Sequence, residues 1–307
     1  MENSLNNIKK ICFGFLCLGG GVALGAELPV LPEYTEFFCT PIYLKYEIKL
    51  ETHNNEEIIR ALEVDLSGVE ISNDISKSRY NTESWYATNG KEFVLQTYRT
   101  DAPKNVEDNI FYVGTENFYL LSESKKKDTI SAVKPIKTPE PLWIKYLNYF
   151  PVFDEEVTWI PLNDIFKSGE VTDISDEKNP DKKTFLLRKF SGISGDKKFY
   201  DNYKISFSVT ESITLLLNEI SLYSTVEKES KPAYNLPPTI VIKYNDYENF
   251  EKIKVALPKK IEIFRYVVID NVKNSPNPYD QFLFSTENVT LTEFIVDAKI
   301  SPASDVH

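Results

Sequence analysis

Residues 42–51 read Ile-Tyr-Leu-Lys-Tyr-Glu-Ile-Lys-Leu-Glu, and this stretch decides the expected fold. Apolar or aromatic side chains stand at every even position from Ile42 to Leu50, and charged side chains stand at the odd positions from Lys45 to Glu51. Successive side chains of a β-strand point to opposite faces, so this alternation is typical of a strand with one buried and one solvated face. The stretch therefore predicts a strand over residues 42–51 in a sheet that covers an apolar core.

The same period of two returns along the rest of the chain. Residues 60–66 repeat the pattern, and we expect this segment to pair antiparallel with residues 42–51. Polar and proline-containing stretches at residues 167–183 and 228–238 are expected to be loops. Further strands are expected at residues 183–190, 203–209, 212–221, 239–244, 252–257, 260–269 and 286–300.

Two hairpins are indicated by their turn residues. Residues 84–88 and 91–98 flank Asn89-Gly90, a dipeptide that favours a two-residue hairpin because both turn positions must take positive φ. Residues 109–113 and 118–121 flank a second turn that begins at Gly114. A chain of antiparallel hairpins is therefore expected after the first strand.

One segment changes its period from two to that of a helix. Trp143, Tyr146, Leu147 and Phe150 fall at positions i, i+3, i+4 and i+7, which places them on one helical face. Pro141 precedes this stripe and Pro151 follows it, as start and stop signals would. The spacing predicts a short amphipathic helix over residues 141–150, whose aromatic stripe either packs into a core or contacts a ligand.

The N-terminal residues have the three parts of a secretory signal. Lys9 and Lys10 precede an apolar run over residues 11–26 that ends in small residues, and polar chain follows from Glu27. The run is shorter than the ~20 apolar residues that span a bilayer. We expect residues 1–26 to be removed and residues 27–307 to form a single β domain outside the cytoplasm. The alternative is a retained N-terminal anchor.

Composition removes several classes of function. A net charge of −11 repels phosphate backbones and anionic lipid surfaces, so no nucleic-acid partner is expected. His53 and His307 are the two histidines of the sequence. Most hydrolase mechanisms need a histidine held in a structured pocket, so these mechanisms are not expected. Only Cys39 lies beyond the signal, so an internal disulfide is not expected. Acidic clusters at 154–156 and 173–177 lack a glycine at the bend and favour solvated loops over calcium sites. We expect no enzyme activity, metal or cofactor.

The string at residues 109–122, Asn-Ile-Phe-Tyr-Val-Gly-Thr-Glu-Asn-Phe-Tyr-Leu-Leu-Ser, is similar to a hairpin of the LolA/LolB-like lipoprotein carriers of the bacterial periplasm. In that family a helical segment follows the hairpin, as residues 141–150 would here, and residues 249–263 resemble its strand, Leu-Pro and strand. Val113 stands where the family has aspartate, and residues 93–95 stand where it has an arginine.

This resemblance implies a mainly β fold, a curved antiparallel sheet or incomplete β-barrel with a short helical lid. It also implies a periplasmic, non-catalytic carrier of lipid or lipoprotein acyl groups, which is not an integral membrane protein after processing. A concave apolar face that helices cover only partly leaves a ligand cavity, whereas a fully covered face is a filled core. The alternative function is therefore an extracytoplasmic structural or protein-interaction domain without a ligand. The candidate cavity residues are Leu44, Tyr46, Ile48, Phe93, Leu95, Trp143, Tyr146, Leu147 and Phe150.

Overall fold

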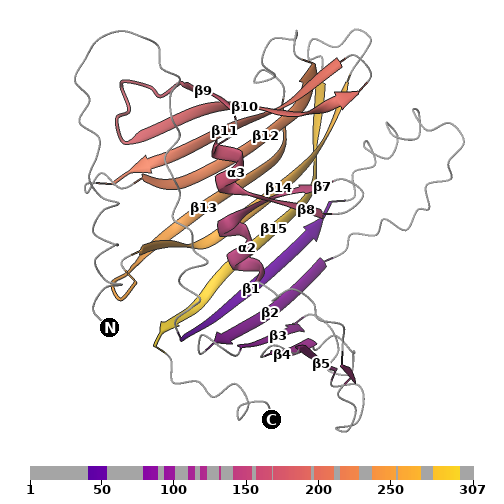
Figure 1. The fold of residues 1–307 in the computed structure, drawn as a ribbon, viewed down its shortest axis with the longest axis vertical. Coiled ribbons are helices and arrows are strands. Elements are labelled where there is room, and N and C mark those ends of the chain that lie inside the picture. The colour runs from indigo at the N-terminus through magenta and orange to yellow at the C-terminus, as the bar shows by residue number, and fades with distance from the viewer. Residues whose placement is uncertain are drawn as a thin grey trace, which may run out of the picture.

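Antiparallel β-strands make up most of the computed structural model (Figure 1). It describes residues 41–53, 79–88, 93–100, 110–114, 118–122, 131–132, 141–153, 157–167, 169–194, 197–210, 215–227, 237–253, 255–270 and 279–297. The N-terminal strands are β1 (Ile42–Thr52), β2 (Arg79–Thr88), β3 (Phe93–Arg99), β4 (Ile110–Gly114), β5 (Phe118–Ser122) and β6 (Ser131–Ala132). A middle segment contains α2 (Leu142–Asn148), β7 (Tyr149–Phe153), β8 (Val157–Pro161) and α3 (Leu162–Lys167). The C-terminal strands are β9 (Glu170–Asp173), β10 (Lys182–Ser194), β11 (Lys197–Val209), β12 (Leu215–Glu227), β13 (Pro238–Phe250), β14 (Val255–Asp270) and β15 (Tyr279–Val296).

Two meanders from opposite ends of the chain join at the centre of one sheet. Over the described residues the sheet has 13 strands in the order β6-β5-β4-β3-β2-β1-β15-β14-β13-β12-β11-β10-β9. Strand β1 pairs with β15 along its whole length, from Ile42 opposite Val296 to Thr52 opposite Ser285. The sheet is not closed into a barrel, because β6 and β9 end the order without pairing with each other.

The middle segment lies across one face of this sheet, with α2 and α3 running over the strands in Figure 1. Buried apolar side chains of the two helices and of the strands beneath them form one hydrophobic cluster. The even-numbered residues of β1 from Ile42 to Ile48 belong to this cluster. The alternation of the first strand thus gives the expected buried face, since burial removes apolar surface from water.

The expected fold class is confirmed: the protein is mainly β, with an open antiparallel sheet and a short helical cover. Both expected hairpins are confirmed as β2–β3 and β4–β5. The helix predicted over 141–150 is α2, which begins at Leu142 and ends at Asn148. Its last expected turn is replaced by β7, which pairs with β8 and contains Pro151.

Three expectations about strands are wrong. The pairing of residues 42–51 with residues 60–66 is excluded, because β2 and β15 occupy both edges of β1. The loop expected at 167–183 contains strand β9. The two strands expected at 252–257 and 260–269 are one strand, β14, which runs through Leu257-Pro258. Residues 1–26, Cys39, residues 60–66, the turn at 89–90 and residues 154–156 lie outside the described residues.

Candidate functional site

The residues expected to line a cavity are buried between the helical layer and the sheet. Eight of the nine belong to one apolar cluster, and the exposed fraction of each is between 0% and 8%. They are Leu44, Tyr46, Ile48, Leu95, Trp143, Tyr146, Leu147 and Phe150. The ninth, Phe93, begins β3, and its side chain lies outside the described part of the chain. The structure therefore brings eight of these side chains into one buried cluster.

Aromatic rings join the middle segment to the strands below it. The ring of Trp143 lies 6.3 Å from that of Phe294 on β15. At the far end of α2, Phe150 meets Tyr203 of β11 edge-on at 5.7 Å. Edge-on aromatic pairs of this kind add about 0.5–1.5 kcal/mol beyond the area that they bury. The two pairs fix the two ends of the α2–β7 segment to different parts of the sheet.

Polar contacts also fasten α2 to the sheet. The phenol oxygen of Tyr46 accepts a hydrogen bond from the Leu142 backbone N–H at 3.2 Å, and so satisfies one of the free donors at the start of the helix. The Tyr244 hydroxyl donates to the carbonyl of Tyr146 at 3.0 Å. These bonds link α2 to β1 and β13, two strands of the central sheet.

A buried ion pair lies under the middle of α2. The Arg265 Nη2 atom is 2.6 Å from Glu287 Oε2, and both side chains are largely removed from solvent. The same Arg265 nitrogen lies 3.5 Å from the hydroxyl of Tyr146. Burial, together with the nearby Glu287 carboxylate, raises the pKa of the Tyr146 hydroxyl well above its ordinary value. The Tyr146 hydroxyl is therefore in its neutral form wherever the protein is folded at neutral pH.

Among the buried polar atoms of this interface that have no hydrogen-bond partner in the described residues, two lie on aromatic side chains. They are the indole Nε1 of Trp143 and the hydroxyl of Tyr203, each on a side chain with no exposed surface. Burial raises the pKa of the Tyr203 hydroxyl far above its ordinary value. A buried donor without a partner costs about 1–3 kcal/mol, so closing the helical layer onto the sheet leaves a local penalty at these two points.

Alkaline pH is expected to unfold the protein through these buried tyrosines. Burial raises the pKa of Tyr46 from 10.0 to about 12 in the folded state. The unfolded chain then releases its protons first, so stability is full below about pH 10 and falls as the pH rises towards 12. A circular-dichroism titration should show loss of β-structure together with ionisation of a late tyrosine class. Ionisation of every tyrosine near pH 10 with the β-signal intact would contradict this assignment.

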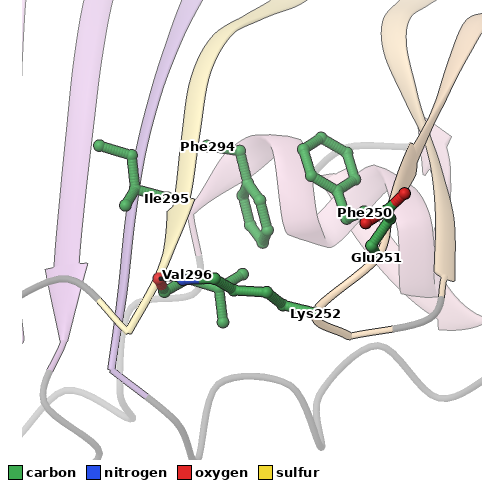
Figure 2. Close-up of a pocket in the computed structure, with 6 residues that line it drawn as sticks. All are labelled: Phe250, Glu251, Lys252, Phe294, Ile295 and Val296. Carbon is green, nitrogen blue, oxygen red and sulfur yellow. Dashed lines mark hydrogen bonds between the residues drawn. The ribbon is translucent and has the colours of Figure 1, made fainter.

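A small apolar pocket opens beside the first turn of α2 (Figure 2). Its volume is about 240 Å³, and it is lined by Phe250, Glu251, Lys252, Phe294, Ile295 and Val296. Figure 2 shows the rings of Phe250 and Phe294 side by side, and their centroids are 4.7 Å apart. Phe294 also contacts Trp143, so the pocket adjoins the buried cluster under α2.

A lysine borders this pocket. The ammonium group of Lys252 donates to the Val296 carbonyl at 3.2 Å and lies 3.7 Å from the carboxylate of Asp297. The Lys252 side chain is itself about two-thirds exposed (66%). The pocket thus combines an aromatic wall with the charged groups of Lys252 and Glu251 at its rim, an arrangement that suits an apolar group attached to a polar head.

Comparison with known protein families, curated proteins and solved structures finds no match to this chain. No helix among the described residues is both long and apolar enough to cross a membrane. Within the same residues, no three His, Cys, Asp or Glu side chains are grouped as metal ligands would be. Asp173 ends β9 and Asp176 lies in the exposed loop that follows it, and their carboxylates accept hydrogen bonds from the backbone N–H groups of Ser175 and Lys178.

The pocket residues were not among the candidates from the sequence. Phe250 ends β13 and Phe294 lies near the end of β15, and these two strands stand two places apart in the sheet order. Their meeting depends on the sheet order and on the curvature at the strand ends, neither of which a local pattern contains. The signal that could have found them is their aromatic character at the polar ends of long strands, which is unusual for a solvated turn.

Proposed function

We propose that this protein is a non-catalytic extracytoplasmic binding protein that carries lipid or lipoprotein acyl groups, with α2 acting as a displaceable lid. The observation that carries the proposal is the pair of buried, unpartnered polar atoms on Trp143 and Tyr203, at the lid and at the sheet below it. Such atoms oppose closure of the lid, which lowers the cost of opening it for a ligand. The resemblance to the LolA/LolB-like carriers also supports a carrier function.

The size of the pocket supports a moving lid. Ligand pockets usually measure about 300–1,000 Å³. The pocket at Phe250 and Phe294, at about 240 Å³, holds only one end of a long acyl chain. The rest of such a chain would have to enter the apolar cluster beneath α2, where Trp143 is the nearest buried side chain that contacts the pocket wall. Lys252 would then lie near the head group.

A second function is favoured by one specific observation. Eight of the nine candidate cavity residues are almost completely buried, with Trp143 and Phe150 at 0% exposure. A permanently filled core of this kind would make the protein a structural or interaction domain that acts through its surface. The two functions differ in one measurable property, which is saturable uptake of an apolar ligand.

Binding of an acyl probe should separate the two. The purified protein is titrated with a fluorescent long-chain fatty acid, alongside Trp143→Ala and a matched control, Phe207→Ala. Phe207 is as deeply buried as Trp143 but lies under α3, against Phe166 and Phe185. Both variants should lose about 3–5 kcal/mol of stability in urea melts, because each removes a large buried ring. Only Trp143→Ala should also bind the probe at least about tenfold more weakly, a loss of ~1.4 kcal/mol.

The contrary result is equally clear. If the folded wild-type protein takes up no probe at any concentration below the solubility limit of the fatty acid, the carrier function is wrong and the filled-core function stands. Native mass spectrometry of protein isolated from its own compartment gives an independent reading, since a carrier should retain lipid. The same mass shows whether residues 1–26 have been removed.

A further inference from the structure

The outer edge of β10 is covered over only part of its length. Strand β9 pairs with residues 185–188, and the Ile174 N–H donates to the Thr184 carbonyl beyond them. From Lys189 to Ser194, no described strand lies on this side, although β10 remains paired with β11 as far as Ser194. The chain joins this edge at Gly169, directly before β9, where an added Cβ would approach the Arg188 carbonyl to 2.9 Å. Among the described residues, the strand therefore continues past β9 without a neighbour on this edge.

Backbone groups of this open stretch face outward at defined positions. The bond from Ile174 shows that Thr184 points its carbonyl to the outer side, and alternation gives Arg188 and Phe190 the same direction. A bulge between Phe190 and Gly192 shifts the register, after which Gly192 lies opposite Phe199 and Ile193 opposite Lys198. Phe190 and Ile193 consequently present their N–H and C=O groups at the open edge.

The side chains of the same two residues are the most exposed large apolar groups of this strand. Phe190 is 49% exposed and Ile193 is 64% exposed. Phe190 packs edge-on against Tyr200 at 5.7 Å, and the Arg188 guanidinium lies 4.4 Å over the Tyr200 ring. An edge that is merely protected from aggregation would hold charged groups or proline at these positions. This edge instead presents an apolar platform beside backbone groups that pair with no described strand.

Charge identifies the kind of partner. Residues 182–204 hold seven lysines and arginines but only two aspartates, in a protein whose net charge is −11. A second copy that paired antiparallel along the same edge would bring two such basic hairpins together, and like charges would oppose it. An acidic strand would meet opposite charge along the whole hairpin. Extended peptides that add to a free sheet edge gain affinity from backbone bonds and specificity from alternate side chains.

We propose that residues 189–194 of β10 bind an extended acidic peptide of a partner protein as an added strand, in line with β9 (Figure 1). The peptide's backbone bonds with Phe190 and Ile193. Its apolar side chains contact Phe190 and Ile193 on one face of the sheet, and its carboxylates lie on the other face near Lys189. The site is separate from the pocket beside α2, because β10 and β15 stand five places apart in the sheet order. It does not depend on the lid.

The test uses a blocked, fluorescein-labelled peptide of alternating glutamate and valine, with fluorescence anisotropy as the readout. Wild-type protein should bind it saturably, and more weakly as salt is raised. Ile193→Pro removes one outward N–H at an edge position that tolerates proline, and should weaken binding at least about tenfold. Ile193→Thr keeps that N–H and β-branching, and should change affinity by less than about threefold. Lys189→Glu should weaken binding without touching a backbone donor.

Amide exchange gives a second readout, because the Phe190 and Ile193 N–H groups should exchange more slowly when the peptide is present. Melting curves check that each variant remains folded. If the proline variant does not fold, Lys189→Glu still tests the proposal. The proposal is overturned if wild-type protein does not bind the peptide. Equal binding of a lysine-valine peptide, equal binding by Ile193→Pro, or dimerisation through this edge in light scattering would also overturn it.

Discussion

Tyr46→Lys is expected to unfold the protein or to lower its free energy of unfolding by about 4 kcal/mol or more, a large part of the 5–15 kcal/mol of a typical domain. Tyr46 is 2% exposed, and its hydroxyl accepts the first hydrogen bond of α2. A lysine there would place an unpaired ammonium in the apolar cluster and would have no acceptor for the Leu142 N–H.

The neighbouring substitution is the matched control. Lys45 points to the opposite face of β1, where its ammonium pairs with Glu83 at 2.7 Å and its side chain is one-third exposed (33%). Lys45→Tyr loses this pair, which is worth under ~1 kcal/mol at such a site. The new ring would lie opposite Trp85 in the register, beside the stacked Tyr43. Urea melts of the two variants should differ widely in midpoint, and equal shifts would mean that the face of β1 is wrongly assigned.

Breaking the buried ion pair should have the second large effect. Arg265→Met leaves the Glu287 carboxylate buried without its cation, and Glu287→Leu leaves the Arg265 guanidinium without its anion. Each single change is expected to cost about 3–5 kcal/mol, because an isolated charge stays in a site removed from water. The double variant replaces both charges with apolar groups and should recover most of this loss.

A double-mutant cycle measured by urea unfolding tests this expectation. The sum of the two single-variant losses in unfolding free energy should exceed the loss of the double variant by a coupling energy of at least ~1–3 kcal/mol, as neighbouring residues in one network show. Tyr146→Phe serves as a control for the weak 3.5 Å contact to Arg265 and should cost much less. Additive losses in the cycle would show that the two charges are solvated in solution and do not stabilise each other.

The sequence predicted elements whose signals are local. Alternation over residues 42–51 correctly predicted β1 and its buried face, and the aromatic spacing from Trp143 correctly predicted α2. It could not predict that β1 pairs with β15, since several strands carry a similar alternation and the partner lies at the far end of the chain. The wrong pairing with residues 60–66 followed from the usual preference for neighbours in sequence.

Short elements gave too little signal. Strand β9 is four residues long with Val171 as its only apolar side chain, so its surroundings suggested a loop. Helix α3 has six residues, fewer than two turns, and no periodic stripe can be recognised over that length. Eight of the nine predicted cavity residues lie in one buried cluster, but whether they enclose space or fill it depends on how closely α2 approaches the strands, which no spacing in the sequence encodes.

The pairing of β1 with β15 also governs when the sheet can form. Strand β1 is made early in synthesis, whereas its partner β15 is the last described strand to be made. Contacts between such distant segments slow folding, because the loop entropy is lost before the contacts are gained. A chain without β15 therefore has two separate meanders, and the strands β1 and β14 each have one edge without the partner that β15 supplies. The sheet becomes continuous only after β15 has been made, so joining of the two meanders is a late step even though the neighbouring strands within each meander can pair earlier.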